Sequence, residues 1–226
     1  MPTSSWEWGS TRVRTLDATA GTAAAIERDA LQRGLAWLGP EDRTCSPLFA
    51  ALLGVVRAWG GEAALRTLTP PPPSAGWATG QRHSARDFLR LLSACAQYLE
   101  TTLGSRPLAL QCLGAEVARV YFGAATGPLA AVVAARDPEG LLERLAGALD
   151  VALGFGRHRA YALGQRHWRL GCSADPLPPD FYLGLLQRLL LEVDVDGEVR
   201  AHTRGLGEVH YEVTWQLPAY RPPALS

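Results

Sequence analysis

The sequence predicts an α+β fold, with a helical N-terminal half followed by a hairpin, a helix and a second hairpin. Up to residue 153, apolar residues recur at helical spacing. Beyond residue 157 the period falls to two, most clearly over 208–215, where Val209, Tyr211, Val213 and Trp215 alternate with polar residues. Two hairpins are too small to stand alone, so we expect one four-stranded antiparallel sheet covered by helices.

Composition describes an ordinary globular chain and excludes some functions. Of 226 residues, 47% are hydrophobic and 19% charged. The 22 basic residues, all arginine, balance 22 acids, so no net field attracts nucleic acid or an anionic membrane surface. Schiff-base or general-base chemistry on lysine is excluded. We expect a cytoplasmic protein without a signal sequence or transmembrane helix, because the nearest apolar run, 123–135, is too short to cross a bilayer.

The chain is expected to form one domain between a flexible N-terminal arm and a C-terminal tail. Four consecutive prolines, Pro70–Pro73, favour an extended connection between helices, although a ligand for a proline-binding groove would look the same. The expected divisions are an N-terminal arm (1–18), a single domain (19–217) with a helical subregion (19–154) and a sheet subregion (155–217), and a C-terminal tail (218–226).

Capping residues place the helices of the first half. Gly39-Pro40 ends the first and Gly60-Gly61 the second, because both pairs disfavour helix. Ser84 is a candidate N-cap, and Asp137 followed by proline is a strong helix start. The expected helices cover 22–38, 47–59, 62–68, 86–103, 108–122, 128–135 and a stretch from Pro138 to Leu153.

Alternation places the strands of the second half. Strands are expected at 158–163 and 167–172, with Trp168, Leu170 and Cys172 facing the core. Asp180 is expected to cap the amphipathic helix that follows the prolines at 176–179. Strands at 198–203 and 208–215 then flank a turn at 205–207.

Four stretches resemble a paralogous family of unknown function expanded in the myxobacteria and regarded as restricted to Myxococcales. Their order and spacing carry the resemblance: LAWLGPEDRTCSPLFAALLGVVRAWGGEAALRTL (35–68), SARDFLRLLSACAQYL (84–99), DPEGLLERLAGALDVALGFGRH (137–158), and LPPDFYLGLLQRLLLEV with EVHYEVTW (within 177–215). The chain departs from the family at Cys45–Phe49, where members often carry Arg-Gly-Leu-Phe-Phe. The element order also resembles vinyl-reductase-type sensor domains, haem–nitric-oxide sensor domains and a vesicle-tethering subunit. That resemblance implies a ligand-enclosing or assembly domain.

No catalytic, metal or cofactor site is predicted. Cys45, Cys95, Cys112 and Cys172 lack zinc-finger spacing and are expected to be free thiols. His83 lies at a helix start and His158 between arginines, so neither suits haem. His202 and His210 share the polar face of one hairpin, near Glu198, Glu208 and Glu212. They are open to two interpretations, a metal site or a solvated face.

The best local signal is the hairpin 157–169, in which Arg157, Arg159, Arg166 and Arg169 are interleaved with aromatic residues and no acid. Arginine forks suit an anion or an acidic partner, but the exposed face of an amphipathic hairpin would look alike. The sequence therefore favours a non-enzymatic sensor or interaction module that binds a small ligand or a protein partner and is compatible with a homodimer. The alternative is an enzyme that holds a small hydrophobic or anionic substrate between helices and sheet.

Overall fold

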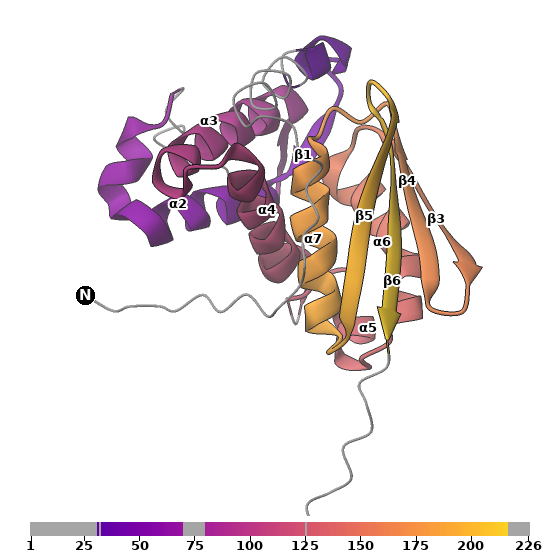
Figure 1. Ribbon diagram of the computed structural model, residues 1–226. Helices are drawn as coiled ribbons and strands as arrows, with labels where there is room; N and C mark the ends of the chain where they lie inside the picture. The colour runs from indigo at the N-terminus through magenta and orange to yellow at the C-terminus, as the bar shows by residue number, and fades with distance from the viewer. Residues whose placement is uncertain (1–30, 32, 70–79, 125, 217–226) are drawn as a thin grey trace, which may run out of the picture.

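The computed structural model shows an α+β fold in which one helix joins a helical half to a sheet (Figure 1). It describes residues 31, 33–69, 80–124 and 126–216. The predicted arm, the Pro70–Pro73 stretch, the tail and most of the first predicted helix lie outside the described residues. Helix α7 (Pro179–Glu192) lies between the helical half and the sheet, because it contacts both α4 (Arg106–Val117) and β5 (Asp196–Gly205).

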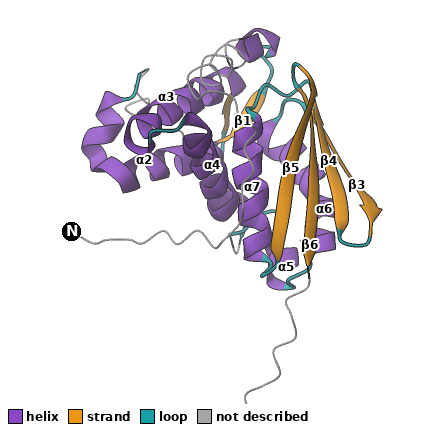
Figure 2. Ribbon diagram, viewed as in Figure 1, coloured by secondary structure: helices purple, strands orange, loops and turns teal. Residues whose placement is uncertain are grey.

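The predicted four-stranded antiparallel sheet is confirmed (Figure 2). Its order is β3-β4-β6-β5, with β3 (Arg157–Gly164), β4 (His167–Ser173) and β6 (Glu208–Gln216) beside β5. The four apolar residues expected to face the core from β6 are all buried. Their polar neighbours are half-buried or exposed, so one sheet face is covered and the other meets solvent.

Two helices cover the inner face of the sheet. Helix α6 (Pro138–Leu153) contacts β3 and β4, and α7 contacts β5. The predicted cap of α6 is confirmed, since the Asp137 carboxylate accepts a hydrogen bond from the Gly140 N–H at 2.9 Å. The predicted cap of α7 is wrong: Pro178 occupies the N-cap position and Asp180 lies in the first turn, because Pro179 is suited to the first helical position.

The helical half follows the prediction with shifted boundaries. The glycine pair predicted to separate two helices does interrupt α2 (Ser46–Thr67), because Gly61 has φ 65° and two helical segments meet there at a kink. Ser84 precedes α3 (Ala85–Leu103), but its side chain makes no capping bond. The predicted helix 108–122 becomes α4 followed by a π-helical turn, η1 (Ala118–Phe122), and a short helix α5 (Ala130–Ala134) comes next.

A second, two-stranded sheet was not predicted. Strands β1 (Arg43–Cys45) and β2 (Arg82–Ser84) pair antiparallel, with Arg43 opposite Ser84. Three residues are too few to show alternation, so the pattern contains no signal for them. The Thr44 hydroxyl donates to the carbonyl oxygen of Leu153 at 2.8 Å and so ties this small sheet to the end of α6.

Helices α4 and α7 pack backbone against backbone. A Cβ added at Gly114 would lie 1.9 Å from the Phe181 carbonyl oxygen, and one added at Gly184 would lie 2.0 Å from that of Gln111. Real Cβ atoms are not found at such distances, so glycine is required at both places. This close crossing fixes the position of the helical half relative to the sheet.

Helix α2 is long and apolar enough to cross a membrane, with a mean hydropathy of 1.4 over its best window. The expectation that no segment reaches this length is therefore wrong for α2. Core helices of soluble proteins pass the same test. In this fold α2 packs against α3 and α4.

Candidate functional site

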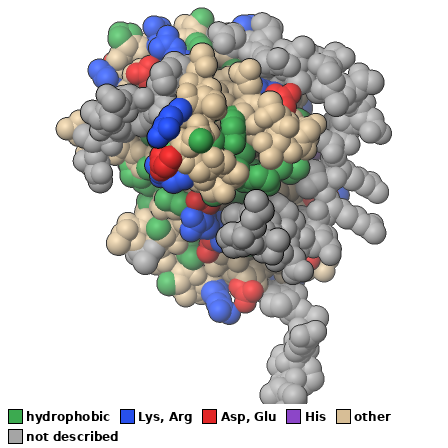
Figure 3. Space-filling model, turned by 90° about the vertical axis from the view of Figure 1, so that its left-hand side faces the viewer, with side chains coloured by type: hydrophobic (Ala, Val, Ile, Leu, Met, Phe, Trp, Pro, Cys, Tyr) green, Lys and Arg blue, Asp and Glu red, His purple; other side chains and the backbone are tan. Residues whose placement is uncertain are grey.

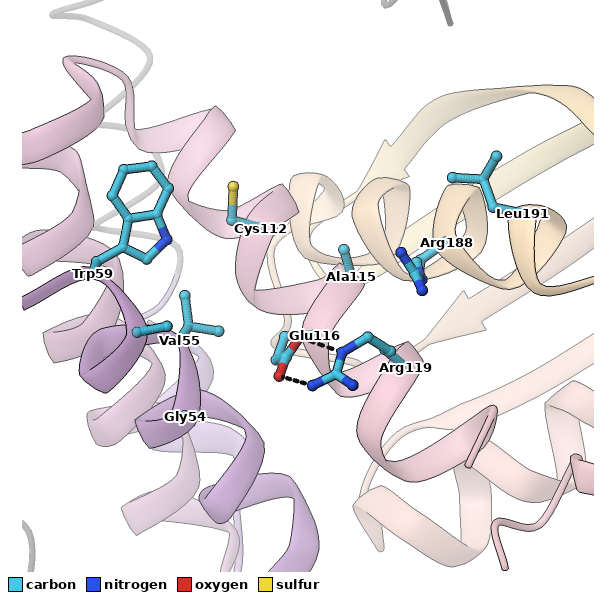
Figure 4. A pocket seen from close by; sticks show the side chains of 10 residues that line it. Gly54, Val55, Trp59, Cys112, Ala115, Glu116, Arg119, Arg188 and Leu191 are labelled. Atoms are coloured by element: carbon cyan, nitrogen blue, oxygen red, sulfur yellow. Dashed lines mark hydrogen bonds and ion pairs between the residues drawn. The ribbon is translucent and has the colours of Figure 1, made fainter. Parts of the chain in front are cut away.

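A groove of about 440 Å³ lies between α2, α4 and α7 (Figure 4). Its lining includes four small residues from two facing helices, Gly54 and Ala58 on α2 and Cys112 and Ala115 on α4. Because none of them carries a large side chain, the helices leave a hollow that neither fills. The volume falls within the usual range of small-molecule sites, roughly 300–1,000 Å³.

Large apolar side chains stand at the rim of the groove. Trp59 on α2 is 40% exposed and Leu191 on α7 is 50% exposed, although both are hydrophobic. Figure 3 shows the molecule from the side of the helical half, where hydrophobic side chains gather near the middle of the face beside charged ones. Exposed apolar groups around a concave site favour the binding of an apolar surface.

Two arginines and one acid supply the charge of the groove. Arg119 donates to Glu116 through Nε at 2.9 Å and through a terminal nitrogen at 2.6 Å (Figure 4). Arg188 donates through Nε to Glu192 at 2.7 Å. A guanidinium has five N–H donors, so each arginine can serve a further acceptor. Burial raises the pKa of Cys112, and its thiol in the groove therefore stays neutral.

A buried polar cluster lies on the other side of α7, beneath the β3–β4 hairpin. The ring nitrogens of His158 face two acids, with Nδ1 2.7 Å from Asp150 Oδ1 and Nε2 3.0 Å from Asp175 Oδ2. The hydroxyl of Tyr182 lies 2.8 Å from Nε2 and donates to Asp175. Cys172 is buried beside them, because its position in β4 is paired with that of His158 in β3.

Two neighbouring acids raise the pKa of His158 in this cluster. Burial lowers the pKa of His158, but its hydrogen bonds to Asp175 and Asp150 and their charges outweigh burial and raise it above its ordinary value. Burial also raises the pKa of Cys172 well above that of a free thiol. A cysteine, a histidine and an acid are the residue types of a site with a cysteine nucleophile, a base and an orienting acid. Nevertheless Cys172 is only 2% exposed and His158 5%, so a substrate has no route to them.

Sequence reasoning missed this cluster. The expectation that His158 lies in polar surroundings between arginines is wrong, because its neighbours point to the opposite face of β3 and its own side chain points inward. The strand period could have revealed it, since His158 shares the inward parity of the strand and lies in a hairpin with Cys172. Asp150 and Asp175 come from a helix and a loop, which no local pattern connects.

Potential metal ligands lie closer together in this cluster than at the other histidines of the sheet. Within the described residues, only His158, Cys172 and Asp175 bring three candidate ligand atoms within 4.8 Å of one another. His202 and His210 do lie directly opposite each other across β5 and β6, as their parity predicts. Glu212, the acid 3.7 Å from His202, also accepts a hydrogen bond from Arg169 at 2.5 Å.

The four arginines predicted as an anion or partner contact occupy the β3–β4 hairpin. Arg157 and Arg159 are exposed on the outer face of β3. Arg169 is paired with Glu212, and its guanidinium lies 5.9 Å from the ring centre of Tyr161. Arg166 lies in the turn with a φ of 56°. Binding of an anion by these residues stays a prediction.

The fold is shared with solved H-NOX proteins. An H-NOX protein from S. oneidensis in the Fe(II)NO ligation state superposes with a TM-score of 0.62 at 13% identity, covering 77% of this chain and 100% of that one. An Fe(II) unliganded H-NOX protein from K. algicida gives 0.60 at 14% identity, covering 79% and 100%. An oxygen-binding H-NOX domain related to soluble guanylate cyclases gives 0.57 at 12% identity, covering 80% and 99%. Identities this low show the fold alone.

Four of the five histidines of this chain do not fit haem, the group named for a further structure of this fold with a TM-score of 0.59. Both ring nitrogens of His158 are engaged by acids, and the space beside it is occupied by Tyr182 and Tyr211, both fully buried. The histidines at 167, 202 and 210 belong to the sheet positions that face away from the core. None of these four histidines thus faces an apolar cavity of the kind that a haem ligand requires. His83, in β2, contacts the buried Phe49 with 5.7 Å between the ring centres, and among the described residues no histidine lines the groove.

Sequence comparison identifies the family. No curated protein matches the chain significantly. The model of a family described as "Protein of unknown function (DUF2378)" matches residues 40–216. The match spans every element from β1 to β6, which agrees with the resemblance carried by the four sequence stretches. The chain therefore belongs to this family, DUF2378.

Proposed function

We propose that the protein is a non-enzymatic, cytoplasmic ligand-binding module that holds a small, mainly apolar molecule in the groove between α2, α4 and α7. The observation that carries this proposal is the groove itself, which has a volume of about 440 Å³ and is lined by small residues on two facing helices. The low-identity likeness to H-NOX proteins supports it at the level of fold only, since fold alone does not determine function.

The charge of the groove suggests the chemistry of the ligand. Its lining contains Arg119 and Arg188, which are paired with Glu116 and Glu192 yet keep further N–H donors. A molecule with an apolar body and one anionic end would place that end near Arg188 and its body against Trp59 and Leu191. Arginine is well suited to a carboxylate or sulfonate, because its planar donors bind such groups in pairs.

The enzyme alternative has less support. It needs a substrate pocket between the helices and the sheet, where Tyr182 and Tyr211 are fully buried and their ring centres lie 5.3 Å apart. Phe181 packs against Tyr182 from the same helix, with 6.0 Å between the ring centres. These aromatic side chains occupy the space that a substrate would use.

A fluorescence titration of the full-length protein with anilinonaphthalene sulfonate tests the proposal. This probe has an apolar body and one anionic end, and it fluoresces in apolar surroundings. We expect saturable binding at one site. Ala58→Phe, an exposed position on α2 that lines the groove, should weaken binding at least tenfold by filling the hollow. Val151→Phe is the matched control, because Val151 is 65% exposed on α6 and is not among the groove-lining residues.

A loss of probe binding is informative only for variants that remain folded. Partly unfolded proteins also bind this probe, so both variants must keep the circular dichroism spectrum and the melting temperature of the wild type. Equal affinity of the wild type and Ala58→Phe would contradict the proposal. So would an absence of saturable binding to the folded wild type.

A further inference from the structure

We propose that His158, Cys172 and Asp175 form a binding site for a divalent transition metal of the zinc class, with Asp150 orienting the histidine. The site is separate from the groove, and its position follows from the sheet. The register of β3 and β4 pairs His158 with Cys172, and the chain leaves β4 so that Asp175 follows three residues later. Two adjacent strands, held by α6 and α7, therefore present the three side chains to one point.

The donor atoms suit zinc. They are an imidazole nitrogen, a thiol sulfur and a carboxylate oxygen, all within 4.8 Å of one another. Zinc bonds of roughly 2.0–2.3 Å place neighbouring ligand atoms about 3–4 Å apart, so a small closing movement would bring these atoms into position. His158 Nε2 and Asp175 Oδ2, at 3.0 Å, are already close enough. A thiolate together with an imidazole disfavours magnesium and calcium, which prefer oxygen ligands.

A divalent ion can be held at this depth without net charge. The side chains of His158 and Asp175 are 0% and 2% exposed, and an unpaired charge there is costly. On binding, the Cys172 thiol proton leaves to solvent and His158 binds as a neutral imidazole through Nε2. The dipositive ion, the thiolate and the Asp175 carboxylate then sum to zero charge. The neutral imidazole completes the set without adding charge.

Asp150 has the place of an outer-shell partner. Its Oδ1 lies 2.7 Å from His158 Nδ1 and also accepts a hydrogen bond from the His158 backbone N–H at 3.2 Å. A carboxylate on one ring nitrogen keeps the proton there and leaves the other nitrogen free for a metal, an arrangement common around zinc-bound histidines. Asp175 is held as well, because its Oδ1 accepts a hydrogen bond from the Leu177 backbone N–H at 2.9 Å.

Two buried phenols, Tyr182 and Tyr211, lie near these ligand atoms, with 5.3 Å between their ring centres. The Tyr182 hydroxyl contacts both His158 Nε2 and Asp175 Oδ2. The Tyr211 hydroxyl is fully buried and, within the described part of the chain, has no hydrogen-bond partner. A buried hydroxyl without a partner costs free energy, so such a group beside a set of metal-ligating atoms indicates a missing ligand. A metal-bound water or the Tyr182 oxygen itself would complete four-coordination.

Cobalt substitution tests this site by spectroscopy. The full-length protein is unfolded in the presence of a chelator and refolded with Co(II), so that a buried site can fill during folding. We expect one equivalent of cobalt and a near-ultraviolet thiolate-to-cobalt absorption band. Cys172→Ser, a nearly isosteric change, should fold and lose the band. Cys45→Ser is the matched control, because Cys45 is another free thiol outside the cluster and its removal should leave the band unchanged.

Zinc affinity provides the second measurement. Asp150→Asn should weaken zinc binding about tenfold to hundredfold while one equivalent still binds, because it alters only the outer partner of the histidine. Absence of the thiolate band from refolded wild-type protein would overturn the proposal. A band that persists in Cys172→Ser would overturn it too, because the thiolate would then belong to another cysteine.

Discussion

His158 is joined to Asp150 by two hydrogen bonds that connect the start of β3 to the last turns of α6. Asp150 Oδ1 accepts one from the His158 backbone N–H and lies 2.7 Å from the ring Nδ1. The histidine side chain is fully buried, whereas that of Asp150 is 51% exposed. One half-exposed acid therefore satisfies two groups of a buried residue, and it ties the sheet to the helix that covers it.

Asp150→Ala is expected to lower the free energy of unfolding by about 1–3 kcal/mol, because a buried ring N–H loses its partner. Urea unfolding with a chelator present measures the effect without bound metal. Glu62→Ala serves as a comparison, since Glu62 forms an ion pair with Arg57 in which both side chains are more than half exposed. That change should alter stability by less than about 0.5 kcal/mol. Equal changes in the free energy of unfolding for the two substitutions would show that the Asp150 contact contributes no more than an exposed ion pair.

Gly184→Ala is expected to destabilise the protein by about 1–3 kcal/mol or to prevent folding, because the new Cβ would overlap the Gln111 carbonyl oxygen. Gly147→Ala is the control. Gly147 lies within α6 with no atom within 4 Å of an added Cβ, so alanine should stabilise the helix by about 0.5–1 kcal/mol. Thermal and urea unfolding of both variants give the comparison. A tolerated Gly184→Ala would mean that α4 and α7 do not cross this closely.

The strand and helix patterns predicted much of this fold, for reasons visible at single residues. Val209 and Tyr211 alternate with polar neighbours, so the inward face of β6 follows from period alone. The crossing of α4 and α7 could not be predicted in this way. Gly114 and Gly184 break no local pattern, and their function appears only when two distant helices meet.

The groove and the buried cluster were beyond local patterns for the same reason. The groove arises because Gly54 and Ala115, from different helices, are both small where those helices face each other. In the cluster, only the pairing of His158 with Cys172 could be predicted from the sequence, since both lie in one hairpin. Asp150 reaches them from α6, so its part depends on packing between elements.

Asp180 is expected to make stability depend on pH. Burial raises the pKa of its carboxyl, although a hydrogen bond from Gln111 at 2.9 Å opposes the shift. A folded-state pKa above the unfolded value means that the folded protein holds the proton more tightly. This contribution is fully present below the unfolded pKa, about 3.9, and is lost as the pH rises through the higher folded value.

Asp180→Asn should therefore abolish the loss of stability that ionisation of Asp180 causes as the pH rises. Its melting temperature should exceed that of the wild type at about pH 7, and the difference should shrink as the pH falls towards about 4. Calorimetry of both proteins across this range checks the prediction. A difference that is constant with pH, or of opposite sign at neutral pH, would show that Asp180 is not strained by burial.

Arg188→Gln should weaken binding of anilinonaphthalene sulfonate by about threefold to tenfold, because a partly exposed charge-assisted hydrogen bond is lost. Phenylnaphthylamine is the matched probe, since it has the same apolar body without the sulfonate. Its affinity should be unchanged by the substitution. Fluorescence titrations with both probes separate the two parts of the groove. Equal losses for the two would place the anionic end elsewhere.

The most direct test of the proposed ligand site is a map of amide chemical shifts in the full-length protein as anilinonaphthalene sulfonate is added. The largest changes are expected in the segments that carry the groove-lining residues, Gly54–Trp59 on α2, Cys112–Glu116 on α4 and Arg188–Leu191 on α7. Because the probe is an anion, the same titration also tests whether the arginine-rich hairpin binds it. Largest changes at Arg157–Arg169, with the groove amides unmoved, would contradict the account.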